Sequence, residues 1–190
     1  APSGSPGAAT NSAGSGQSVG SVSGCTGPQV PHDPYSPPCA QFSGSNGGST
    51  SRGVTASTIT VTFRISADDI LGVDSLVNRI AGKSTSSQFK ETDADVERTV
   101  QDLATYFNNH FQFYGRKIDV KFIHGQGQLL QEFPDAGQAQ ANADALTVAD
   151  QEKAFAETFA ISQPYAEALS AQHVVNLGTV FMSQQWFQQH

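Results

Sequence analysis

The sequence contains little cysteine, tryptophan, methionine or positive charge. Among 190 residues there are two Cys, one Trp and one Met, and 10 Lys and Arg stand against 17 Asp and Glu, for a net charge of −7. No basic run and no basic aromatic patch occurs, which argues against a nucleic-acid-binding surface. No apolar run approaches the length that spans a membrane, so we expect no transmembrane segment in this chain.

Charge is scarcest at the start of the chain. Residues 1–51 are rich in Ser, Gly and Pro, and Asp33 is their only charged side chain. Such a segment cannot bury enough apolar surface to offset the entropy lost on ordering. We therefore expect a disordered tail over residues 1–52, acting as a tether or spacer, and a folded part over residues 53–190.

The two cysteines, Cys25 and Cys39, flank a Pro-rich stretch. Two cysteines this close, with none elsewhere, suit a local disulfide in an exported protein, and two idle thiols are the alternative. No Cys-x-x-Cys motif is present to indicate a redox role. Residues 22–25 match a lipoprotein cleavage consensus, but no charged and apolar leader precedes them. Residue 1 is Ala, which indicates a processed chain or a fragment.

The strongest local pattern is a helix followed by a strand. Apolar residues recur at three- and four-residue steps from residue 96 to residue 111, which predicts one buried helical face. Thr92 and Asp95 predict a capping box at the helix start, and Gly115 predicts the turn after it. Residues 117–123 then alternate as a strand does.

The other segments repeat this alternation of strands and helices. Ser162 and Pro164 are typical of a helix start, as is Asp135 with Gln138. The expected strands are 59–65, 117–123, 154–158 and 173–177, and the expected helices are 70–80, 92–111, 136–150, a helix opened by Ser162, and a helical segment from 183. The sequence therefore predicts an α/β fold with a parallel sheet, helices on both faces and strand order 2-1-3-4.

Three stretches carry a resemblance to a known family. They are 53–61 at the entry to the first strand, 106–109 with 115–118 at the helix–turn–strand passage, and 153–156 with 162, 166–171 and 173–177. In this order and spacing, residues 53–190 resemble the amino-terminal part of a type 1 periplasmic solute-binding protein, of the branched-chain amino-acid receptor kind.

This resemblance implies a non-catalytic extracytoplasmic protein that captures a small polar, amino-acid-like solute by lobe closure, for an ABC permease or a sensor. It also implies a first lobe truncated at the C-terminus. The chain departs from the family at Ser66-Ala67-Asp68-Asp69, where such receptors often have a Pro-Leu-Thr-Gly-like loop, and at 124–127, where many are acidic. The ligand type is therefore not carried over.

Ligands of open parallel sheets bind beyond the carboxyl ends of the strands. The residues expected there as ligand-binding are Arg64, Ser66, Glu157, Ser162 and Thr179. Ser162 begins a helix, where free N–H groups suit a carboxylate or phosphate, or else it only caps that helix. Arg64 and Glu157 are expected either to form a mutual salt bridge at the sheet rim or to face a polar ligand.

Other motifs lack the required context. The Gly-x-Ser-x-Gly pattern at 16–20 lies in the low-complexity tail, and Gly125-Gln126-Gly127 lacks the third Gly of a dinucleotide fingerprint. The five His residues and the acids Asp68, Asp69 and Asp74 show no metal-binding spacing. We therefore expect no catalytic residue, no metal and no cofactor. Two alternatives stay open: a secreted α/β enzyme with catalytic residues beyond His190, and an envelope interaction module without a small ligand.

Overall fold

The computed structural model describes residues 28–39, 42, 44–68, 92–179 and 182–189. The expected helix over 70–80 lies outside these residues. The elements are β1 (Thr58–Ile65), α2 (Asp93–His110), β2 (Lys117–His124), α3 (Leu129–Glu132), α4 (Gln138–Leu146), a π-helical turn (Thr147–Gln151), β3 (Ala156–Glu157), α5 (Gln163–Ala171), β4 (Val175–Asn176) and α6 (Gln184–Gln189).

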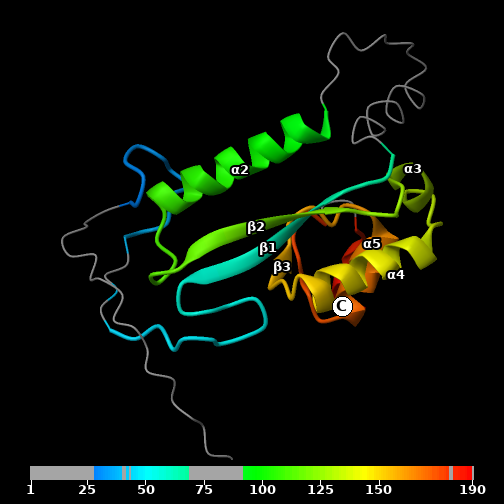
Figure 1. The fold of residues 1–190 in the computed structure, drawn as a ribbon. Helices are drawn as coiled ribbons and strands as arrows, with labels where there is room; N and C mark the ends of the chain where they lie inside the picture. The colour runs from blue at the N-terminus through cyan, green and yellow to red at the C-terminus, as the bar shows by residue number, and fades with distance from the viewer. Residues whose placement is uncertain (1–27, 40–41, 43, 69–91, 180–181, 190) are drawn as a thin grey trace, which may run out of the picture.

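The four strands form one parallel sheet in the order β2-β1-β3-β4, which confirms the predicted order. Figure 1 shows β2, β1 and β3 side by side. β1 and β2 pair along their whole length, from Thr58 opposite Lys117 to Ile65 opposite His124. β3 and β4 are two residues each, shorter than predicted. One backbone hydrogen bond on each side of β3 extends its pairing with β1. Phe155 N–H donates to Thr60 C=O before β3, and Thr158 N–H donates to Thr62 C=O after it.

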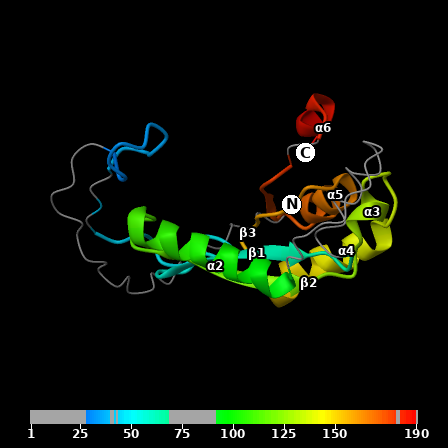
Figure 2. The same ribbon diagram turned by 90° about the horizontal axis from the view of Figure 1, so that it is seen from above.

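Helices cover both faces of the sheet, as the sequence predicts. Alternate residues of a strand point to opposite faces. Val61 and Phe63 of β1 line a groove with α2, whereas the Arg64 side chain contacts α4 and α5. Figure 1 shows α2 above β1 and β2 and α4 and α5 below them, and in the view from above α2 runs across the strands (Figure 2).

The start of α2 confirms the predicted capping box. Thr92 Oγ1 accepts a hydrogen bond from Asp95 N–H, and Asp95 Oδ2 accepts one from Thr92 N–H at 3.0 Å. The Thr92 backbone and hydroxyl, with Arg98, lower the pKa of the Asp95 carboxyl to about 2. Near the other end, the Asn108 side chain bonds both the N–H and the C=O of Ile118, which fixes α2 against β2.

The predicted N-cap at Asp135 is wrong. α4 begins at Gln138, and its N-cap is Gly137, whose φ of 74° lies in the left-handed region. Asp135 instead closes the preceding short helix α3, because its N–H donates to Glu132 C=O. Asp135 therefore lies in the turn that follows α3, and residues 136–137 connect this turn to α4.

The core lies between α4 and α5. Small side chains on both helices allow their backbones to approach closely, as the Ala-rich sequence of α4 indicates. The fully buried members include Ala141, Ala145, Val148, Tyr165, Ala166 and Leu169. Trp186 of α6 belongs to the same cluster, so the C-terminal helix packs on this core. Among the described residues, no helix combines the length and apolar character needed to cross a membrane.

Residues before position 53 contact the folded part. Arg116 is only 9% exposed, and its guanidinium donates to the carbonyls of Asn46, Gly48 and Thr55. Gln29 Oε1 accepts the Gln112 N–H. The described parts of the predicted tail are thus tied to the turn between α2 and β2, because their backbone carbonyls serve as acceptors for a buried cation.

Cys39 is disulfide-bonded. Cys25 lies outside the described residues, so the pairing of Cys25 with Cys39 stays a prediction.

We predict that Gly53→Ala destabilises the fold more than Gly48→Ala. Both glycines have left-handed φ values, 71° and 67°. A Cβ at Gly53 would lie 2.3 Å from the Phe155 backbone N, whereas a Cβ at Gly48 meets no atom within 4 Å. Both variants should lose about 1–2 kcal/mol of unfolding free energy, because a residue with a Cβ is strained in the left-handed region. Gly53→Ala should lose roughly 1–3 kcal/mol more from overpacking. Urea unfolding measures the unfolding free energy of both variants. Equal losses would show that the close approach of residue 53 to the Phe155 backbone does not affect stability.

Candidate functional site

The structure brings three of the five predicted ligand-binding residues into one buried network. Arg64, Glu157 and Ser162 are each at most 2% exposed and belong to this network. Ser66 lies beside it, and its hydroxyl donates to Asp68 C=O. Thr179 is half-buried and lines a separate cavity beyond β4.

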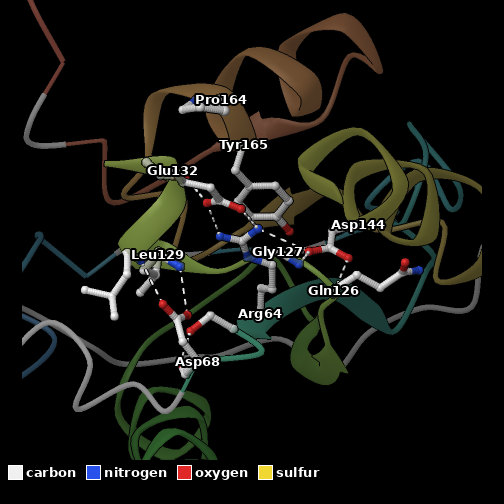
Figure 3. Close-up of polar contacts among 12 residues, drawn as sticks. Arg64, Asp68, Gln126, Gly127, Leu129, Glu132, Asp144, Pro164 and Tyr165 are labelled. Atoms are coloured by element: carbon white, nitrogen blue, oxygen red, sulfur yellow. Dashed lines mark hydrogen bonds and ion pairs between the residues drawn. The ribbon is translucent and has the colours of Figure 1, made fainter. Parts of the chain in front are cut away.

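Arg64 is the centre of this network (Figure 3). Its Nη2 and Nη1 atoms bond the two Glu132 oxygens at 2.7 and 2.9 Å, and Nη1 also bonds Asp144 Oδ2 at 3.2 Å. The guanidinium carbon lies 3.7 Å from the centroid of the Tyr165 ring, at a distance typical of a cation–π contact. The charge of Arg64 is therefore paired with two carboxylates and covered by an aromatic face.

The surroundings of Arg64 hold it in the charged form. Burial acts to lower the pKa of the guanidinium, but the hydrogen bond and charge of Glu132 raise it above its ordinary value. A paired and hydrogen-bonded charge can stay ionised inside a protein, whereas an isolated one cannot. Arg64 thus connects β1 to α3, α4 and α5.

Glu157 does not form the expected salt bridge with the Arg64 side chain. Its Oε1 accepts the backbone N–H groups of Arg64 and Phe159, and its Oε2 accepts the Tyr165 hydroxyl at 3.2 Å. Burial raises the pKa of the Glu157 carboxyl above its usual value of 4.5. Burial and the Glu157 charge raise the pKa of Tyr165 well above 10.0. Glu157 therefore bridges β1, β3 and α5 through backbone and hydroxyl groups.

Ser162 begins α5, as predicted, but its side chain does not cap the helix. It has the extended backbone of an N-cap residue (φ −101°, ψ 146°), and no side-chain hydrogen bond reaches the first turn. Its hydroxyl instead donates to Glu132 Oε2. The first-turn N–H groups of α5 are therefore left without a side-chain acceptor from Ser162.

Two glycines pack directly on the buried acids. A Cβ on Gly125 would lie 2.5 Å from Asp144 Oδ2, and a Cβ on Gly127 would lie 2.2 Å from Glu132 Oε1. Asp144 also accepts the N–H groups of Gln126 and Gly127, at 2.7 and 3.0 Å. The Gly-x-Gly segment after β2 is thus required for close approach to the network.

Sequence reasoning missed Glu132, Asp144 and Tyr165 as members of the network. Asp144 offered a signal, because it is a charged residue on the same helical face as Ala141, Ala145 and Val148, which are all fully buried. A charge on a buried face requires a partner. Asp68, for which the sequence indicated no metal-binding spacing, accepts the N–H groups of Leu129 and Leu130 at the start of α3.

Two cavities border the sheet. One, of about 390 Å³, lies between β4 and α6. The other, of about 380 Å³, is an apolar groove along α2. Among the described residues that line it, only Thr158 is polar, and its hydroxyl donates to Thr62 C=O. The groove therefore offers a polar solute little to bind. No group of three or more potential metal ligands occurs in the described ranges.

The chain matches no protein-family model, no curated protein and no solved structure. The parallel α/β sheet is established by the structure itself. The resemblance to solute-binding receptors stays a prediction.

We predict that Arg64→Met destabilises the protein by about 3–5 kcal/mol, because Glu132 and Asp144 would stay buried without a counter-charge. The exposed pair Arg98–Asp95 provides the control, with side chains 67% and 38% exposed. Arg98→Met should change the unfolding free energy by less than about 1 kcal/mol. Denaturant unfolding of both variants tests this, and a loss at Arg64 no larger than at Arg98 would contradict it.

We also predict a pH-dependent effect of Glu157→Gln. The folded pKa of Glu157 is raised above 4.5, so its contribution to stability is complete below pH 4.5 and is lost as pH rises through the folded pKa. Gln resembles the protonated acid and does not titrate. The unfolding free energy of the variant relative to the natural chain should therefore increase above pH 4.5, by at most about 1.4 kcal/mol per pH unit. Urea unfolding across this range measures the difference, and parallel pH curves would refute the shift.

Proposed function

We propose that this chain is part of a non-catalytic extracytoplasmic solute-binding protein that captures a small amino-acid-like solute. The observation that carries the proposal is the start of α5, which lies just after β3 and has no side-chain cap. Helix N-termini bind carboxylates through free N–H groups and the positive end of the helix dipole. Ligands of parallel sheets also bind beyond the carboxyl ends of the strands.

The charge of the neighbouring network supports an amino-acid-like ligand. Arg64 contributes one positive charge, whereas Glu132 and Asp144 contribute two carboxylates. The surplus negative charge favours a nearby ammonium group, while the start of α5 favours a carboxylate. A zwitterion carries both groups.

Two observations support a non-catalytic role and an extracytoplasmic location. The hydroxyls of Ser162 and Tyr165 are buried and donate to carboxylates, an arrangement that suits structural roles better than attack on a substrate. The disulfide at Cys39 is typical of an oxidising, extracytoplasmic compartment. An ABC-type permease or a sensor would receive the captured solute, and no cofactor is required.

The test is a calorimetric binding screen of free amino acids, with neutral sugars as the comparison. We expect at least one amino acid to bind and the Gln163→Glu variant to bind it more weakly. Gln163 is the exposed first residue of α5, and a negative charge there favours the helix but repels a carboxylate. The expected loss is about fivefold or more, from about 1 kcal/mol of repulsion.

Gln172→Glu is the matched control. It adds the same charge at the opposite end of α5, so it should leave binding unchanged. If no amino acid binds, or if both variants bind equally well, the proposed function is wrong.

A further inference from the structure

The apolar groove along α2 is open to solvent. Nine of the ten described residues that line it are apolar, and the tenth is Thr158. Leu103 and Phe107 of α2 form one wall and are 51% and 41% exposed, and Leu177, which follows β4, is 48% exposed on the far side. Exposed apolar surface that is gathered in one hollow marks an interaction site. The groove is therefore a candidate binding surface.

The position of the groove fits a helix. Its floor is formed by Val61 and Phe63 of β1, on the face of the sheet that α2 also covers. From Val100 to Phe107 the groove follows α2 for two turns, about 10 Å. A second helix on this face would lie alongside α2 over the neighbouring strand. Its side chains at spacings of three, four and seven residues would enter the groove.

Two other kinds of occupant fit the groove less well. A small-molecule site normally buries about 70–90% of its ligand, which walls that are 41% to 51% exposed do not provide. A partner strand pairs with the edge of a sheet, whereas the floor of this groove is a sheet face. An amphipathic helix needs neither an enclosed cavity nor a free edge.

The charges of α2 favour basic groups on such a helix. Four acids occur in the first ten residues of α2: Asp93, Asp95, Glu97 and Asp102. Arg98 pairs with Asp95 at 2.7 Å, and Glu97 Oε1 lies 3.2 Å from His124 Nε2. The first part of α2 therefore has a surplus of negative charge.

The other surroundings of the groove carry little charge. At the end of α2, His110 stacks on Tyr106, and Lys117 Nζ donates to Asn108 C=O. None of the described lining residues is charged. Opposite charges across an interface steer association and select the partner. The acids of α2, and the net charge of −7 of the whole chain, therefore favour a basic partner.

We propose that the groove binds an amphipathic helix of a partner protein, with its apolar face in the groove and Lys or Arg residues beside α2. The surface lies on the face of the sheet opposite α4 and α5, so it is separate from the start of α5 (Figure 1). It does not depend on the proposed amino-acid site.

The experiment uses three synthetic peptides of about 18 residues, long enough to populate a helix. The first has Leu at helical spacing on one face and Lys and Gln elsewhere. The second has Glu in place of each Lys, and the third is a scrambled form of the first without an apolar face. Fluorescence anisotropy should show binding of the Lys peptide, binding about tenfold weaker of the Glu peptide, and none of the scrambled peptide.

A matched pair of variants tests the location. Leu103→Gln should weaken binding of the Lys peptide about tenfold, because it removes an apolar contact from the wall of the groove. Leu146→Gln is the control, because Leu146 is 45% exposed and ends α4 on the opposite face of the sheet. It should leave peptide binding unchanged, as should Gln163→Glu at the proposed amino-acid site.

A second pair tests the charge. Asp102→Asn should weaken binding of the Lys peptide about threefold, whereas Asp150→Asn, the same change in the turn after α4, should not. No binding of the Lys peptide, equal binding of the scrambled peptide, or equal losses at Leu103 and Leu146 would overturn the proposal. Equal affinity for the Lys and Glu peptides would reject a basic partner. Loss of amino-acid binding with retained binding of the Lys peptide would reject the proposed function alone.

Discussion

The burial of one guanidinium group governs how this molecule is assembled. Arg64 is 2% exposed, and moving its charge out of water is unfavourable unless acids and an aromatic face surround it. Glu132, Asp144 and Tyr165 supply those partners from three separate helices. A change in the position of any of these helices would leave a charge unpaired, so the network selects one arrangement of α3, α4 and α5 on the sheet.

The same network determines what the carboxyl edge of the sheet can offer to a ligand. Arg64 and Glu157 bond to groups of this chain, so neither is available at the surface as a charge. The Ser162 hydroxyl donates to Glu132, so it does not cap the start of α5. The charged side chains at this edge therefore hold the fold together and are not free to meet a solute.

The parts of the fold that follow from local physics were predictable. The Thr92–Asp95 capping box and the strand order depend on neighbouring residues and on alternation, and both are confirmed. The partners of Arg64 could not be predicted from the sequence. Glu132 and Asp144 lie 68 and 80 residues away from it, and no local pattern links them to it. The cap at Asp135 was misplaced because α3, a single turn, precedes α4 and carries no periodicity of its own.

The hydrogen bonds of Arg116 have a consequence for where this protein can be cut. Composition places a boundary near residue 53, yet Asn46 and Gly48 supply two of the three carbonyls that bind this guanidinium. A truncation at residue 53 would delete those two acceptors and leave a nearly buried cation with only the Thr55 carbonyl. The folded unit therefore begins before residue 46, within a segment whose composition is typical of a linker.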